Sequence, residues 1–301
     1  MASTKSWIKA ARPRTLPLAL SGIITGSGLA WFYGEFDWGV CLLAIVTATL
    51  LQIFSNLAND YGDFQRGTDN EQRVGPVHTM QGGEITPKEM RTGMLISVIL
   101  SLFFGFWLVY KGTWEKSHLV FFCFLGFGIL SLLAAYFYTG GKKPYGYFGL
   151  GDLSVFLFFG LLPVMGIFFL NTQSFPAEII LPAVSIGCFS TGVLNLNNVR
   201  DIDNDRQSGK VTLAVRIGSR NGKIYQVFLI LTGLLTAIIF TESRFRSPWQ
   251  WLFLLSAPFF IADLIRIFKT KDAQKLYPFL KRLALSTFAF AILFIAGLFL
   301  S

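Results

Sequence analysis

Nine separate stretches of about 20 predominantly apolar residues constrain how this chain can fold. A helix of that length and composition crosses the hydrocarbon core of a bilayer, and a soluble domain cannot bury so many of them. We therefore predict an all-α integral membrane protein with nine transmembrane helices. They are expected near 15–33, 38–58, 93–112, 117–138, 150–171, 177–198, 223–241, 247–268 and 281–300.

The composition agrees with a chain that lives in lipid. Hydrophobic residues make up 53% of the sequence and charged residues 14%, whereas soluble proteins carry charge on about a quarter of their residues. The net charge of +9 is accounted for by membrane topology and attraction to anionic lipid, so no nucleic-acid partner is expected. Because no linker or low-complexity stretch divides the chain, we predict one membrane domain over 1–301.

The placement of Lys and Arg predicts the orientation, because positively charged loops stay in the cytoplasm. With a cytoplasmic N-terminus and nine spans, nearly all of the 26 basic residues fall on the cytoplasmic side. The exceptions are Lys111, Lys116, Arg244 and Arg246. The basic segment up to Arg14, which includes Trp7, is expected to lie at the headgroup level and to lead into the first span.

Two short acidic clusters each end a long apolar segment. The first runs from Asn56 to Asp63 and on to Asp69, and the second from Asn197 to Asp205. With only 17 acidic residues in the chain, this concentration indicates a divalent metal site. The clusters follow the second and sixth predicted helices, so an even number of spans separates them and both face the same side, over a central cavity.

The spacing within the clusters suits a metal bound by oxygen. Asn59 and Asp63 are four residues apart, as are Asp201 and Asp205, so a helix continuing past the apolar run would place each pair on one face. Carboxylate and amide oxygens suit Mg²⁺, which commonly shares its coordination with substrate phosphates. The clusters thus predict a diphosphate site, at which diphosphate leaves an allylic carbon and a nucleophile captures the carbocation.

Basic residues near the clusters would bind the phosphate oxygens. Lys142 and Lys143 compete for one such role, and for Arg66, Arg73, Arg206 and Arg216 the alternative to a phosphate ligand is a topology determinant. The alternative for the first cluster is a solvated helix end whose Asp and Asn are caps, and the alternative for the second is an Asp-rich loop with basic neighbours. His78 reads as a solvated loop residue. The basic residues plausibly within reach are Arg14, Arg66, Arg73, Lys142, Lys143, Arg200 and Lys210.

The order of these motifs resembles the UbiA superfamily of intramembrane aromatic prenyltransferases. Within it, the chain is most similar to the branch that acts on 1,4-dihydroxy-2-naphthoate in menaquinone biosynthesis. The similarity extends from the N-terminus to about Gly218. The segments that carry it are Arg12 to Pro17, Ser55 to Asp63, Gly67 to Asp69, Arg73 to Pro76, Pro144 to Tyr147, Gly149 to Asp152, Asn197 to Asp201, Gly209 with Lys210, and Thr212 with Leu213.

The resemblance implies transfer of a polyprenyl group from polyprenyl diphosphate to 1,4-dihydroxy-2-naphthoate, at the ring carbon that bears the carboxylate, with loss of CO₂ to give demethylmenaquinone. It also implies Mg²⁺ held by Asn59, Asp60, Asp63, Asp69, Asp201 and Asp205. Asp69 ranks lower, because Gly67 stands where the broader superfamily has its last Asp. The diphosphate contacts would be Arg14, Arg73, Lys143, Arg200 and Lys210, with Tyr138 orienting the acceptor or stabilising the cation.

Two rival functions remain at this stage. A cation-coupled transporter would also carry intramembrane acids, but here they gather at one face and not at the midplane. A sibling enzyme acting on 4-hydroxybenzoate, a tocopherol precursor or haem would have the same metal site and differ in its acceptor pocket. Menaquinone synthesis points to a bacterial inner membrane, with the active site facing the cytoplasm.

Overall fold

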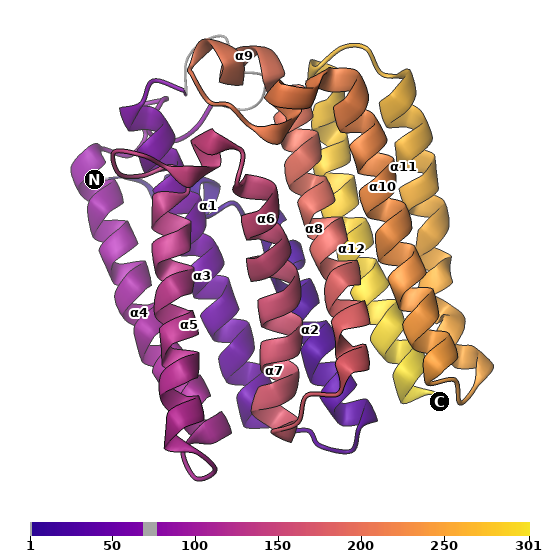
Figure 1. Cartoon of the computed structure of the whole chain (residues 1–301). Coiled ribbons are helices and arrows are strands. Elements are labelled where there is room, and N and C mark those ends of the chain that lie inside the picture. The colour runs from indigo at the N-terminus through magenta and orange to yellow at the C-terminus, as the bar shows by residue number, and fades with distance from the viewer. Residues whose placement is uncertain (1, 69–76) are drawn as a thin grey trace.

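The computed structural model describes residues 2–68 and 77–301. Over these ranges the chain is all helical and contains nine helices long and apolar enough to cross a membrane, which confirms the predicted fold class and count (Figure 1). In chain order the spans are α1 (Thr4–Ala11) with η1 (Pro13–Thr15) and α2 (Leu16–Phe32); α3 (Trp38–Gln65); α4 (Pro87–Thr113); α5 (His118–Phe137); α6 (Gly151–Val155) with η3 (Phe156–Leu161) and α7 (Leu162–Thr172); η4 (Ala177–Ile179) with α8 (Ile180–Arg200); α10 (Leu213–Ser243); η5 (Pro248–Ser256) with α11 (Ala257–Lys269); and η6 (Gln274–Leu276) with α12 (Tyr277–Phe299). Two short helices, η2 (Tyr145–Phe148) and α9 (Ile202–Gln207), lie between spans.

Polar side chains cap the starts of two spans. The Asp37 carboxylate accepts from the first backbone N–H groups of α3, and Thr86 forms a capping box with Glu89 at the start of α4. At its other end α3 continues to Gln65 rather than stopping at 58. Asn59 and Asp63 therefore lie on a helix, as the spacing predicted.

Two spans contain a local break with an identifiable cause. The segment η3 is π-helical, and Pro163 follows it. Proline has no N–H to donate and its ring crowds the preceding turn, so the helical ladder is rearranged there. In α10, Gly218 has φ 81°, which separates a short leading turn from the span that was expected to begin at 223.

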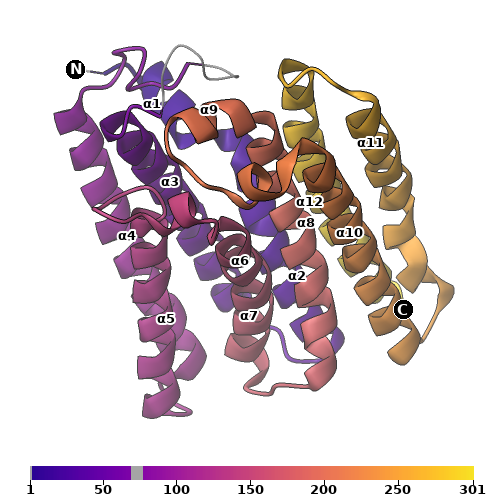
Figure 2. The same ribbon diagram turned by 45° about the horizontal axis from the view of Figure 1, so that its top comes forward.

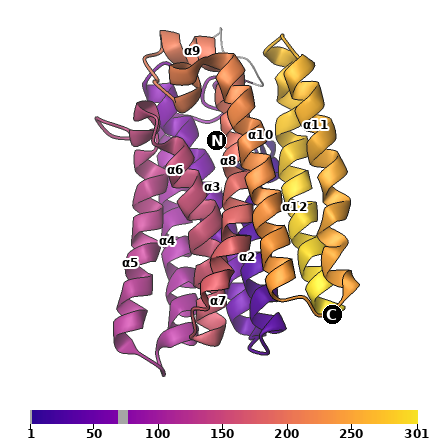
Figure 3. The same cartoon turned by 45° about the vertical axis from the view of Figure 1, so that its right-hand side comes forward.

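The helices differ sharply in burial. In α8, 72% of the most apolar window is buried, and this helix packs against α10, α12 and η3. In α5 only 6% is buried, although the helix is apolar on all sides. A helix of that kind needs lipid around it. Figure 3 shows α4 and α5 at one edge of the bundle and α11 and α12 at the other.

Both acidic clusters lie at one end of the bundle, as predicted. The end of α3, the end of α8, α1 and α9 are all at the top in Figure 1, whereas the chain ends at the bottom after α12. Tilting the top forward shows α9 and the segment after α5 arranged around that end (Figure 2). That this end of the bundle faces the cytoplasm remains a prediction.

Candidate active site

A cavity of about 1030 Å³ opens at the end of the bundle that carries the acidic clusters. Its described lining comes from every span except α10 and α11. The polar lining includes residues of both clusters, namely Asn59, Asp63, Asn197, Asp201 and Asp205. Further in, the wall is apolar and includes Phe106, Phe124, Phe127, Phe158 and Phe159. The cavity therefore has a charged mouth and an apolar interior.

The first cluster presents its side chains from the last turns of α3. The Asp63 carboxylate accepts a hydrogen bond from the Tyr147 hydroxyl at 2.8 Å. Asn59 accepts one from the Thr139 hydroxyl at 3.4 Å. A Cβ on Gly62 would overlap Thr139, so only glycine lets the segment after α5 pack this closely on α3.

The second cluster is not one continuous helix, in contrast to the expectation for Asp201 and Asp205. Asp201 is the residue at which α8 ends and α9 begins, with φ −96° and ψ 10°. The Asp205 N–H nevertheless donates to the Asp201 carbonyl at 2.8 Å, so the two residues stay one turn apart. Both side chains line the cavity.

Arg200 neutralises Asp201 directly. Its Nε donates to one carboxylate oxygen at 2.7 Å and its Nη2 to the other at 2.5 Å, which is a two-point contact. Arg200 is 4% exposed and Asp201 6% exposed. A buried pair of this kind makes each residue depend on the other for stability.

Lys210 stands between the two clusters. Its Nζ lies 3.7 Å from an Asp205 oxygen and 5.5 Å from the centre of the Tyr147 ring. Burial by itself would lower the pKa of Lys210, but the carboxylates of Asp63 and Asp205 outweigh burial and raise that pKa above its ordinary value. The ammonium group is therefore charged at neutral pH and available to an anion in the cavity.

Tyr147, whose contacts the sequence analysis did not predict, holds two residues of the first cluster. Its hydroxyl lies 2.8 Å from Asp63 and 2.5 Å from the Thr68 hydroxyl. Burial, followed by the charge of Asp63, raises the pKa of Tyr147, so the phenol keeps its proton and donates it to the carboxylate. Asn204 on α9 joins the second cluster to the first by donating to the Thr68 carbonyl at 3.1 Å.

Tyr277 is a second residue that the sequence did not reveal. Its hydroxyl accepts a hydrogen bond from Arg14, and the guanidinium groups of Arg14 and Arg200 lie 5.4 and 5.7 Å from its ring centre. All three residues line the cavity. Tyr277 is the first residue of α12, a region without a sequence motif, so its role in the site could be recognised only from the fold.

The remaining predicted residues fall into three groups. Tyr138 lines the cavity with its ring 5.6 Å from that of Tyr145, and burial raises its pKa. Lys143 is exposed and is not among the described lining residues, and neither is Asp60, which is buried against Arg12. Asp69 and Arg73 lie outside the described residues.

The donors on this cavity fit a magnesium ion that shares its coordination with a ligand. Among the described residues, no three His, Cys, Asp or Glu side chains gather closely enough to hold a metal by themselves. The oxygens of Asn59, Asp63, Asp201 and Asp205 instead face a common space. Mg²⁺ is usually bound in this way, by one or two carboxylates with water and substrate phosphates completing the site.

An all-helical membrane bundle with charged clusters at the mouth of an apolar cavity defines a membrane protein that binds an amphiphilic anion. The family model described as "UbiA prenyltransferase family" matches residues 19–288, and the chain belongs to that family. It is 44% identical to the 1,4-dihydroxy-2-naphthoate octaprenyltransferase of Escherichia coli (strain K12), over 99% of this chain and 96% of the relative.

Further similarities agree in name and in fold. The chain is 42% identical to the 1,4-dihydroxy-2-naphthoate octaprenyltransferase of Haemophilus influenzae, over 98% of this chain and 96% of the relative. The solved structure of a UbiA homolog from Archaeoglobus fulgidus bound to GPP and Mg²⁺ is 16% identical, covers 98% of both chains and has a TM-score of 0.66. That structural likeness concerns the fold alone.

Proposed function

We propose that this protein transfers a polyprenyl group from polyprenyl diphosphate to 1,4-dihydroxy-2-naphthoate with loss of CO₂, a step of menaquinone biosynthesis. The observation that carries the proposal is the shared cavity, because residues from α3 and from α8 and α9 meet on it beside the charged Lys210 and Arg200. The relatives named above support the choice of acceptor.

The donor would bind with its diphosphate at the charged mouth and its chain in the apolar interior. Mg²⁺, when bound, would neutralise the diphosphate and make it a better leaving group. In this chain the oxygens of Asn59, Asp63, Asp201 and Asp205 would hold the metal. Arg14, Arg200 and Lys210 supply cationic donors on the same cavity.

The reaction balances without an added oxidant or base. The bond between the allylic carbon and the diphosphate oxygen breaks, and its electron pair leaves with the diphosphate. The ring carbon that bears the carboxylate donates a pair to the allylic cation, and the carboxylate departs as CO₂, returning its pair to the ring. The direct product is the quinol form of demethylmenaquinone. Tyr138 lines the cavity and would face the acceptor or the cation.

The charged mouth is proposed to face the cytoplasm of a bacterial inner membrane. The excess of Lys and Arg in the segments at that end supports this orientation. Reaction of an impermeant thiol reagent with single cysteines placed at 142 and at 246 in intact cells tests it. Labelling at 246 and not at 142 is expected, and the reverse pattern would contradict the orientation.

The transfer assay uses the purified protein in lipid, a radiolabelled polyprenyl diphosphate, and dihydroxynaphthoate labelled in its carboxyl group. We expect prenylated naphthoquinol and labelled CO₂ in equal amounts, and neither after Mg²⁺ is chelated. Parallel reactions with 4-hydroxybenzoate test the sibling activity. Product from 4-hydroxybenzoate and none from dihydroxynaphthoate would overturn the proposed acceptor, and no prenylated product at all would overturn the proposed class.

A further inference from the structure

Arg12, at the junction of α1 and η1, has a backbone conformation that the sequence disfavours. Its φ of 49° and ψ of 65° lie in the left-handed region, where an L side chain crowds the backbone. Pro13 follows, and a residue before proline normally prefers an extended conformation. Such an outlier persists only when its surroundings fix it, and it is a reason to look for function.

Two buried amides of α3 hold the turn on both sides of Arg12. The Asn56 side chain donates to the Ala11 carbonyl at 2.9 Å and to the Thr15 hydroxyl at 3.0 Å. The Gln52 side chain donates to the same hydroxyl at 3.2 Å. These contacts come from residues that are 3% and 7% exposed, so the membrane helix determines the path of the turn.

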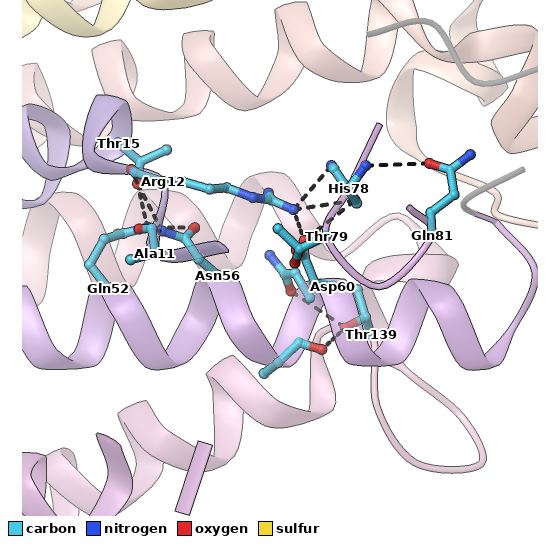
Figure 4. Close-up of polar contacts among 12 residues, drawn as sticks. Ala11, Arg12, Thr15, Gln52, Asn56, Asp60, His78, Thr79, Gln81 and Thr139 are labelled. Carbon is cyan, nitrogen blue, oxygen red and sulfur yellow. Dashed lines mark hydrogen bonds and ion pairs between the residues drawn. The ribbon is translucent and has the colours of Figure 1, made fainter. Parts of the chain in front are cut away.

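The Arg12 side chain is held from the far end by Asp60 and His78 (Figure 4). Arg12 Nη2 donates to an Asp60 oxygen and lies 3.2 Å from His78 Nε2. His78 Nδ1 is 3.4 Å from the same Asp60 oxygen, and Thr79 donates to the other oxygen at 3.4 Å. His78 is 6% exposed, so it is not the solvated loop residue that the sequence suggested.

Arg12 nevertheless remains on the cavity, whereas Asp60 is behind it. Arg12 and His78 line the cavity beside Asn59 and Asp63, and the Arg12 side chain is 17% exposed. Asp60 is 1% exposed and is absent from the described lining. The contacts of the Arg12 guanidinium with the described residues all use Nη2, which leaves Nε and Nη1 for an anion.

We propose that Arg12 is a further donor to the diphosphate and that Asp60 is a positioning residue that aims it, rather than a metal ligand. The inference rests on the proposed function, since it concerns the same diphosphate. Asp60 would act as the carboxylate that fixes a guanidinium at the cavity wall, and the left-handed turn would bring that guanidinium close to the first cluster. The metal would then be held on this side by Asn59 and Asp63.

If the pair of Arg12 with Asp60 only attached α1 to α3, its loss would have different effects on protein yield and on substrate affinity. Loss of a purely structural contact lowers the amount of folded protein without changing the affinity of the remaining folded protein for the prenyl diphosphate. Loss of a phosphate donor raises the apparent KM for the prenyl diphosphate and spares the KM for the acceptor. The exposed pair of Lys9 with Glu84 also fastens α1, and Lys9 is not among the described lining residues, so Lys9→Ala is a matched control.

The experiment measures binding of inorganic diphosphate to the purified protein at saturating Mg²⁺, together with both KM values. Arg12→Ala alone would leave the buried Asp60 unpaired, so Arg12→Lys and the double variant Arg12→Ala with Asp60→Asn are measured beside it. Each is expected to fold and to bind diphosphate about ten- to a hundredfold more weakly, with a raised donor KM. Lys9→Ala is expected to bind as the wild type does.

Two comparisons decide the role of Asp60. Asp60→Asn should weaken diphosphate binding in the wild type but have no further effect once Arg12 is alanine, because it acts through that residue. It should leave the Mg²⁺ concentration for half-maximal activity within about twofold, while Asp63→Asn raises it about tenfold or more. Wild-type affinity in the double variant would overturn the role of Arg12. A Mg²⁺ requirement that moves as far in Asp60→Asn as in Asp63→Asn would overturn the role of Asp60.

These failures are distinct from a failure of the proposed function. A wild-type protein that binds no diphosphate in the presence of Mg²⁺ would overturn the proposed function and this inference with it. A wild-type protein that binds diphosphate, alongside variants of Arg12 that bind it equally well, would overturn this inference alone.

Discussion

The two acidic clusters look alike in the sequence but are neutralised in different ways. In the second cluster the cations are local, because Arg200 precedes Asp201 and Lys210 lies five residues after Asp205. In the first cluster the cation is remote, because Arg12 is 48 residues away from Asp60. The Asp63 carboxylate accepts a hydrogen bond from the neutral Tyr147 hydroxyl, and the cation that acts on it, Lys210, follows the second cluster. The two motifs therefore differ in one respect: in the second cluster the proposed metal ligand Asp201 also supports the stability of the protein, and in the first cluster the proposed ligand Asp63 does so less.

Asp201→Ala is expected to have the largest combined effect. It removes a proposed metal ligand and leaves Arg200 buried without its two-point partner. Loss of one member of a buried pair costs about 3–5 kcal/mol, so both transfer activity and thermal stability in detergent should fall. Asp203→Ala is the control, because Asp203 is exposed and not among the described lining residues. A fully stable Asp201→Ala protein would contradict the dependence of buried Arg200 on Asp201.

Asp63→Ala should lower activity without the loss of stability. Its hydrogen-bond partner Tyr147 is a neutral phenol, and the nearby Lys210 keeps Asp205 as a charged partner when the Asp63 carboxylate is removed. Transfer should fall by about 10² to 10³, while insertion and melting temperature stay close to those of the wild type. If Asp63→Ala melts as early as Asp201→Ala, the proposed difference between the clusters is wrong.

Lys210→Met should mainly weaken donor binding, since the charge between the clusters is lost and the apolar stem is kept. We expect an apparent KM for polyprenyl diphosphate about ten- to a hundredfold higher, with a smaller change in the acceptor KM. Arg206→Ala, at an exposed position on α9, is the matched control. An unchanged donor KM would remove Lys210 from the site.

Tyr147→Phe should have the smallest effect, because it removes one hydroxyl and keeps the ring beneath Lys210. Without the hydrogen bond, Asp63 loses an orienting contact, and the Mg²⁺ concentration for half-maximal activity should rise about two- to tenfold. Tyr61→Phe, whose hydroxyl on α3 contacts only exposed Gln65 among the described residues, should leave it unchanged. Equal shifts in both variants would argue against a link through Tyr147.

The sequence predicted those features that depend on neighbours along the chain. Apolar length gave the nine spans, and the even number of helices between the clusters gave their common end of the bundle. Spacing predicted that Asn59 and Asp63 lie one turn apart on a helix. Each of these inferences needs only a few consecutive residues.

The sequence missed contacts that tertiary packing creates. Tyr277 meets Arg14 across 263 residues, and no periodicity in α12 distinguishes it. The burial of His78 and its contact with Arg12 depend on the fold of the segment before α4. Asp60 was predicted as a metal ligand together with its neighbours in the motif, and the sequence did not predict its contacts with Arg12 and Thr79. Helical spacing alone does not decide which face a carboxylate serves.

Calorimetric binding of inorganic diphosphate tests most directly whether the two clusters form one site. The wild type, Asp63→Asn, Asp205→Asn and the combined variant would be compared with and without Mg²⁺. We predict that diphosphate binding needs Mg²⁺ and that either single change weakens the affinity at least tenfold. The fold-loss of affinity in the combined variant should be smaller than the product of the two single fold-losses. Binding that is independent of Mg²⁺, or that survives the loss of either carboxylate, would contradict a shared metal and diphosphate site.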